Sequence, residues 1–305
     1  MKNVQLWLRA LRAPFFTATA VPVLLGTAVA WYETGDFSPL LLLLSLCGAI
    51  LLHGFTNLAN DYFDHLSGND NDNPGRSPYN GGAGLIQSGE IAAGQVLLAA
   101  KLCLAGVLAI AITLTVVRGW LIALLGVIGA VSGWIYTATP CSLVYRGWGE
   151  LLVGINFGPL MVSGAYYVQS GHLSLRALWV AIPMGLLVST VLYINEFADY
   201  EADRRVGKQT LIVHLGPRRA VIGTYLLFVG TYLAVLGGIV LRSLPLTALV
   251  TLLALPLGWK ACTVTARSYA IPPQMVAASR AGIASQMAVG VLLAIAFISA
   301  RLWMI

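Results

Sequence analysis

Charged residues are scarce in this chain. Only 10% of the 305 residues are Asp, Glu, Lys or Arg, while 58% are hydrophobic, and a soluble domain usually carries about 25% charged residues. This composition excludes a protein whose main solvent is water. The four cysteines are far apart and show no paired spacing, which argues against a disulfide framework or a zinc site.

Long apolar runs are what the sequence has instead. A membrane-spanning helix needs about 20 mainly apolar residues, and the sequence predicts nine such helices joined by short linkers. They are expected over residues 14–33, 39–60, 93–117, 119–138, 149–169, 175–198, 218–241, 244–265 and 282–303. This pattern predicts an all-α membrane protein with a single integral membrane domain over residues 1–305. The basic start, residues 1–12, leads directly into the pattern, so we expect no cleavable signal peptide.

The distribution of charge predicts an orientation. With nine alternating helices, twelve of the eighteen Lys and Arg residues fall on the side of the N-terminus. The N-terminus is therefore expected in the cytoplasm of a bacterial or archaeal cell and the C-terminus outside. Because this bias reports topology, the net charge of +6 does not indicate nucleic acid as a partner.

Acidic residues gather on the same side, although the rule that places basic residues in the cytoplasm does not apply to them. Ten of the twelve are expected there, namely Asp61, Asp64, Asp70, Asp72, Glu90, Glu150, Glu196, Asp199, Glu201 and Asp203. This bias predicts a polar site on the cytoplasmic side.

Two predicted helices end in stacked polar side chains. The second helix ends with residues spaced by three or four, which share one helix face. These are Asn57, Asn60, Asp61 and Asp64, and Asp70 follows in the loop. The sixth helix ends with Asn195, Asp199 and Asp203 at i, i+4 and i+8. Clustered carboxylates repel one another and are costly near a bilayer, so a cation is expected to compensate them.

The ligand type indicates magnesium. Hard oxygen ligands without paired Cys or His favour magnesium over zinc, and magnesium usually joins one or two carboxylates to phosphate oxygens. The predicted metal ligands are Asp61, Asp64, Asp70, Asp199 and Asp203. A diphosphate between the two helix ends would also contact the amides of Asn57, Asn60 and Asn195 and the cations of Arg76, Arg146 and Lys208.

The two motifs resemble those of a known family. Asn60-Asp61-Tyr-Phe-Asp64 and Asp199-Tyr-Glu-Ala-Asp203 are similar to the paired motifs of the UbiA superfamily of intramembrane prenyltransferases. Gly68-Asn-Asp70, Gly207-Lys208-Gln-Thr210-Leu211 and Gly158-Pro159-Leu-Met-Val further resemble its 1,4-dihydroxy-2-naphthoate prenyltransferases of menaquinone synthesis.

This resemblance implies a bundle of about nine transmembrane helices around a central cavity beneath a cytoplasmic cap. It also implies magnesium-dependent transfer of a polyprenyl group from a prenyl diphosphate to an aromatic acceptor, 1,4-dihydroxy-2-naphthoate. The catalytic residues would be Asp61, Asp64, Asp199 and Asp203. Aromatic rings near the motifs can stabilise a positive allylic carbon, and the candidates by position are Tyr136, Tyr145, Trp148 and Tyr193.

Alternatives stay open at this point. Another acceptor is compatible with the same motifs, such as 4-hydroxybenzoate, homogentisate, a tetrapyrrole or an ether lipid, because residue spacing does not reveal the shape of an acceptor pocket. A transporter with a cytoplasmic cation site is a second alternative, since intramembrane carboxylates also mark ion pathways. Its carboxylates would be expected near the middle of the bilayer rather than at helix ends. A third is a lipid-binding scaffold without catalysis.

Overall fold

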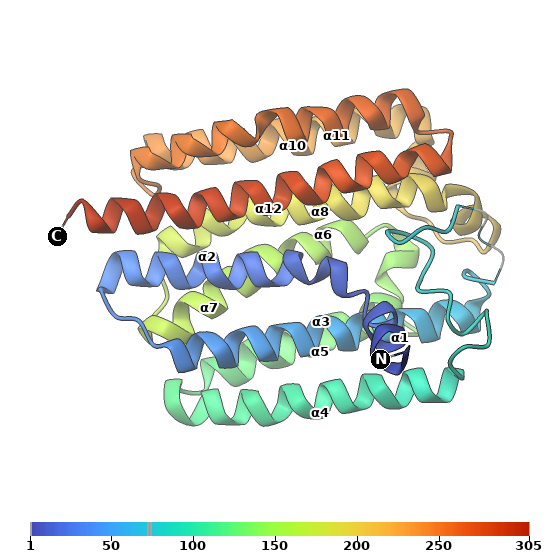
Figure 1. Cartoon of the computed structure of the whole chain (residues 1–305), viewed down its shortest axis with the longest axis horizontal. Helices are drawn as coiled ribbons and strands as arrows, with labels where there is room; N and C mark the ends of the chain where they lie inside the picture. The colour runs from blue at the N-terminus through green and yellow to red at the C-terminus, as the bar shows by residue number, and fades with distance from the viewer. Residues whose placement is uncertain (1, 72, 74, 305) are drawn as a thin grey trace.

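The chain folds into a bundle of helices. The computed structural model describes residues 2–71, 73 and 75–304, and no β-strand forms among them. Asp72 of the predicted acidic side lies outside the described residues. Most helices run along the long axis of the molecule, with α1 and the longest loop at one end and the C-terminus at the other (Figure 1).

The elements follow one another in the order predicted from the apolar runs. They are α1 (Lys2–Ala10), η1 (Ala13–Phe16), α2 (Thr17–Thr34), α3 (Pro39–Ser67), α4 (Ala93–Arg118), α5 (Leu121–Thr137), η2 (Leu143–Arg146), α6 (Gly149–Ile155), η3 (Asn156–Leu160), α7 (Met161–Ser170), α8 (Leu175–Arg205), α9 (Leu211–Leu215), α10 (Pro217–Val240), η4 (Leu246–Ala254), α11 (Leu255–Ser268) and α12 (Pro272–Leu302).

Among the described residues, eight helical stretches are long and apolar enough to cross a membrane, and α5, with 17 residues, is a shorter apolar helix at the remaining predicted position. The all-α membrane fold is thus confirmed. Three helices are longer than predicted, because polar residues continue the helix beyond the apolar run. α3 reaches Ser67 and stops at Gly68, whose φ of 80° ends the helix. α8 reaches Arg205, and α12 begins at Pro272.

The extra length lies at the motif end of the molecule. A helix of 31 residues, such as α8 or α12, is about 46 Å long, whereas the hydrocarbon core of a bilayer is about 30 Å thick. About ten residues of each helix therefore extend past the core. This places the acidic ends of α3 and α8 at the membrane surface rather than in its middle.

The fifth predicted helix is divided into α6, η3 and α7. Its middle piece, η3, is a π-type turn that contains Pro159, a residue without an amide hydrogen to donate to the preceding turn. The side chain of Asn156 donates to the Leu152 carbonyl at 2.7 Å and accepts from the Ser132 hydroxyl at 2.7 Å. Single π-turns of this kind are frequent at functional sites.

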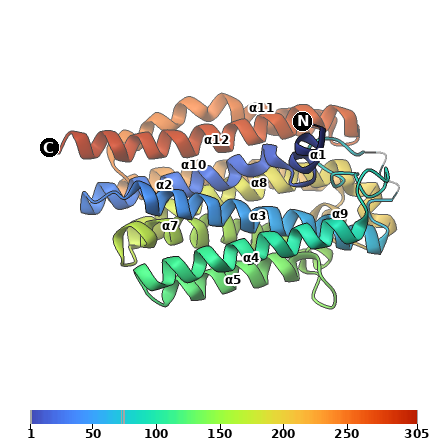
Figure 2. The same ribbon diagram turned by 60° about the horizontal axis from the view of Figure 1, so that its bottom comes forward.

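The core lies where α2, α7, α8 and α12 pack together. Leu25, Tyr166, Met184 and Leu293, one from each of these helices, are fully buried there. Figures 1 and 2 place α4 and α5 at one side of this core and α11 at the other. α8 is thus an inner helix, and its end is held from several directions.

Gly158 tests the closeness of this packing. A methyl group at Gly158 would lie 2.6 Å from the Ala181 carbonyl oxygen and 2.8 Å from the Gly185 Cα atom of α8. Backbone atoms of a packed helix cannot rotate away from a new methyl group as a flexible side chain can. Gly158→Ala should therefore lower the free energy of unfolding by about 1–3 kcal/mol and lower the thermal midpoint in detergent micelles. Gly94→Ala is the control, since nothing lies within 4 Å of that position. Equal midpoints for the two variants would contradict the packing.

Candidate active site

A cavity of about 350 Å³ lies inside the bundle, between α2, α3, α4, α5, α7 and α8. One end is polar and reaches the two predicted motifs. Its walls there include Asn60, Asp64, Asp70, Asn195, Asp199 and Lys208. The other end is apolar, with Leu44, Leu114, Leu125 and Val168 in its walls. One space therefore joins both acidic helix ends to a long apolar chamber.

The first motif is held by a cation that precedes the first predicted span. The guanidinium of Arg12 forms an ion pair with Asp61 and donates to Asn60 Oδ1 at 3.1 Å. Burial alone would lower the pKa of Arg12, but the charge of Asp61 and its carboxylate neighbours raises it above its usual value. The backbone amide of Ala83 donates to the other Asp61 oxygen at 3.2 Å. Asn57 supports the same region by donating to the Leu11 carbonyl at 3.0 Å.

Asp64 lies next to a tyrosine and a lysine. Its carboxylate accepts from Asn60 Nδ2 at 3.0 Å and from the Tyr145 hydroxyl at 2.9 Å. The ammonium of Lys208 lies 5.5 Å from the centre of the Tyr145 ring. Burial and the nearby charge of Asp64 raise the pKa of Asp70 to about 7. Acids of α3 and of the following loop thus share one electrostatic environment.

The second motif is bound by the loop that follows α3. Asp199 Oδ1 accepts from Asn73 at 2.6 Å and from Asn80 at 2.8 Å, and Oδ2 accepts from the Gly81 amide at 3.2 Å. Asp203 is fully buried, and its Oδ1 lies 3.2 Å from Lys208 Nζ and 3.3 Å from Asn69 Nδ2. Burial alone would lower the pKa of Lys208, but the charges of Asp203 and Asp64 raise it well above its usual value.

The donors at this end suit a hard cation. Within the part of the chain that the structure describes, no three Asp, Glu, His or Cys side chains form a closed metal cage. Three buried oxygens, Asp203 Oδ2, Asn69 Oδ1 and Asn195 Oδ1, have no hydrogen-bond partner among the described residues. Magnesium commonly takes one or two carboxylates and completes its shell with phosphate oxygens and water. The residues present therefore fit magnesium held jointly by protein and phosphate.

Several predicted residues lie away from the cavity. Arg76 donates from Nε to the Gly81 carbonyl at 2.8 Å and also binds the Asp70 carbonyl, so it braces the loop. Arg146 is exposed and donates to the Pro140 carbonyl at 3.0 Å, and Trp148 is 56% exposed. Tyr193 points to the opposite side of α8, where its hydroxyl donates to the Ala220 carbonyl of α10 at 2.8 Å.

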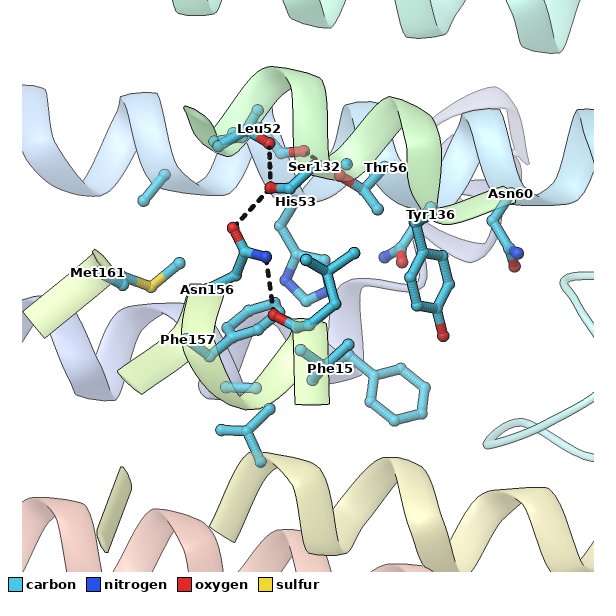
Figure 3. Close-up of a pocket in the computed structure, with 18 of the residues that line it drawn as sticks. Phe15, Leu52, His53, Thr56, Asn60, Ser132, Tyr136, Asn156, Phe157 and Met161 are labelled. Carbon is cyan, nitrogen blue, oxygen red and sulfur yellow. Dashed lines mark hydrogen bonds between the residues drawn. The ribbon is translucent and has the colours of Figure 1, made fainter. Parts of the chain in front are cut away.

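Of the four predicted aromatic residues, Tyr136 alone lines the cavity within the described chain. Figure 3 shows Tyr136, His53 and Phe157 directing their rings into the same space. The His53 ring lies between Phe16 and Phe157, at 5.4 Å and 5.1 Å between ring centres, and its Nδ1 is 2.7 Å from the Thr19 hydroxyl.

Sequence reasoning missed several of these residues. His53 stands four positions before Asn57, so the helical spacing used for the motif would have found it. Arg12 is one of the twelve basic residues on the side of the N-terminus, and no local pattern in the sequence links it to Asp61. Glu196 is one of the ten acids that predict the polar site, and it lines the cavity, where neither of its carboxylate oxygens has a hydrogen-bond partner among the described residues.

Comparison with known proteins agrees with this geometry. The sequence profile of the UbiA prenyltransferase family matches residues 19–278. This chain belongs to that family. As a UbiA-type prenyltransferase it is an enzyme and an integral membrane protein.

Relatives of this UbiA-type chain include enzymes that act on naphthoate compounds. It is 36% identical to the 1,4-dihydroxy-2-naphthoate octaprenyltransferase of Escherichia coli over 221 residues, which cover 71% of this chain and 70% of that protein. It is 30% identical to the enzyme of the same name from Haemophilus influenzae over 259 residues, 84% of each chain. It is 31% identical to the 2-carboxy-1,4-naphthoquinone phytyltransferase of Synechocystis, covering 83% of this chain and 80% of that protein.

Solved structures share the fold. A UbiA homolog from Aeropyrum pernix K1 matches 92% of this chain and 97% of its own, with a TM-score of 0.69 and 17% identity. A UbiA homolog from Archaeoglobus fulgidus bound to DMAPP and Mg2+ matches 93% of this chain and 98% of its own, with a TM-score of 0.61 and 19% identity.

Asn80 tests whether the loop is held on the second motif. Its amide donates to the Gly75 carbonyl at 2.7 Å as well as to Asp199, so Asn80→Ala removes a buried anchor. We expect trypsin to cleave after Arg76 several times faster in this variant, because local opening becomes more frequent. Asn71→Ala is the control, since Asn71 is an exposed residue of the same loop. Unchanged cleavage in Asn80→Ala would contradict the anchoring.

Proposed function

We propose that this prenyltransferase transfers a polyprenyl group from a prenyl diphosphate to 1,4-dihydroxy-2-naphthoate and requires magnesium. One observation carries the proposal: both carboxylate motifs lie at the polar end of a cavity whose other end is apolar. A diphosphate needs the polar end, and a polyprenyl chain needs the apolar end. The names of the E. coli and H. influenzae relatives support the acceptor.

The diphosphate would bind between the ends of α3 and α8. We assign the magnesium ligands to Asp61, Asp64, Asp70, Asp199 and Asp203. When bound, magnesium neutralises charge on the diphosphate and makes it a better leaving group. Lys208 lies beside Asp203 and lines the cavity, so its ammonium can stabilise the same developing charge. The amides of Asn57, Asn60 and Asn195 would orient the phosphates.

The reaction would take place where the polar and apolar parts of the cavity meet. As the C1–O bond breaks, the allylic carbon gains positive charge, which the face of an aromatic ring can stabilise. Tyr136 is the predicted aromatic residue in position for this role. The diphosphate leaves with the electron pair of the C1–O bond, the acceptor ring bonds to C1, and the substituted ring carbon loses a proton to restore aromaticity. The prenyl chain stays along the apolar walls near Leu114 and Val168.

We further propose that residues 1–305 act as one domain, with the active site and the N-terminus in the cytoplasm and the C-terminus outside. The excess of basic residues on the motif side supports this orientation.

Asp64→Asn and Asp199→Asn test the assigned ligands. Each substitution keeps the size of the side chain but removes a negative charge, so each should lower magnesium-dependent transfer in membranes by a factor on the order of 100 or more. Chelation of magnesium should abolish transfer by the unaltered protein. Glu90→Gln is the control, because Glu90 is an exposed carboxylate that contacts Arg9 and Ser88. Full activity in both aspartate variants, with unchanged thermal midpoints, would refute the assignment.

The acceptor is tested with purified protein, magnesium and a panel of acceptors. We expect 1,4-dihydroxy-2-naphthoate to give the dominant prenylated product by mass spectrometry, with little product from 4-hydroxybenzoate or homogentisate. A dominant product from either of the other two would replace the proposed acceptor while leaving the diphosphate site intact.

A further inference from the structure

A second hollow lies on the outer face of the bundle, away from the active site. It is a groove of about 660 Å³ between α11 and α12, and it shares no lining residue with the active-site cavity. α11 contributes Lys260, Val264 and Ser268 to its walls, and α12 contributes Gln274, Ala277 and Arg280. Both cations are exposed.

No acid in this part of the chain balances these two cations. Residues 204–305 include ten Lys and Arg residues but no Asp or Glu. Among the described residues neither Lys260 nor Arg280 forms an ion pair. A cation at a lipid-facing position is costly unless it finds a partner, and no carboxylate of the described residues supplies one for either cation.

The depth of the groove indicates which anion is available. Lys260 lies eight residues before the end of α11 at Ser268, and Arg280 lies eight residues after the start of α12 at Pro272. The two antiparallel helices therefore bring both cations to a similar depth, about 12 Å below their connection. About 20 residues of α12 span the hydrocarbon core, and counting back from Leu302 ends near residue 282. Arg280 is thus at the level of lipid phosphates.

We propose that this groove binds an anionic phospholipid, with its phosphate between Lys260 and Arg280. The deeper walls, which include Leu257 and Ala284, are apolar and suit the start of an acyl chain. Paired basic residues between helices on the cytoplasmic side are a known means of holding anionic lipid headgroups.

A hydrogen bond of Arg280 connects the groove to the active site. Arg280 Nε lies 3.3 Å from the hydroxyl of Tyr79, which belongs to the loop bound to Asp199. The Tyr79 ring packs edge-on against Phe15 at 6.1 Å, and both side chains line the active-site cavity. A lipid phosphate bound to Arg280 can therefore affect the loop through Tyr79. We expect this contact to increase the rate of turnover.

Native mass spectrometry tests the binding without substrate, so its failure is distinct from a failure of the proposed function. Protein is released from vesicles of equal phosphatidylglycerol and phosphatidylcholine. We expect the unaltered protein and the control variant Arg267→Gln to retain phosphatidylglycerol. Arg267 is an exposed basic residue of α11 that lies outside the groove. The double variant Lys260→Gln, Arg280→Gln should retain on the order of tenfold less. Equal retention in all three proteins, equal retention of phosphatidylcholine, or displacement by inorganic phosphate would overturn the proposal.

Activity in vesicles tests the connection to the loop. Lys260→Gln removes one cation without touching Tyr79, so prenyl transfer should fall severalfold in phosphatidylglycerol vesicles and stay unchanged in phosphatidylcholine vesicles. Arg267→Gln should match the unaltered protein in both. If Lys260→Gln behaves like the unaltered protein in both kinds of vesicle, the lipid does not act on the active site.

Discussion

Repulsion among carboxylates governs the end of this structure at which α3 and α8 carry their acidic motifs. Asp61 and Asp64 at the end of α3 and Asp199 and Asp203 at the end of α8 lie close to the same cavity, where like charges destabilise one another. Arg12 and Lys208 offset part of this charge by direct ion pairs. The loop after α3 offsets more of it by directing amide donors to Asp199. The fold of the loop is therefore a consequence of the charge that it covers.

The acids and the cavity are confined to one part of the chain. Every Asp and Glu precedes residue 204, and the helices that line the cavity are α2 to α8. α10, α11 and α12 contribute no wall to it, although α12 packs on α2 and α8 and holds them in place. The first two-thirds of the chain thus form the cavity and hold every acid, and the last third supports them and presents an acid-free surface to the lipid.

Helix length links the site to the membrane. Because α3 and α8 extend past the hydrocarbon core, their carboxylates can meet water-soluble ions, while the same helices line the apolar chamber further in. A substrate with a charged head and an apolar tail would be accommodated along a single axis.

The sequence by itself determined the helical fold, the position of nearly every helix and the family. An apolar run of about 20 residues forms a helix in lipid, because a helix satisfies all its backbone hydrogen bonds internally. The stacking of acids on one face of a helix follows from their spacing in the sequence. Only the tertiary structure decided that Arg12 pairs with Asp61, that Arg76 braces the loop, and that Tyr193 faces α10 rather than the cavity. These outcomes depend on how helices rotate against one another, which packing of the whole bundle sets and no local pattern encodes.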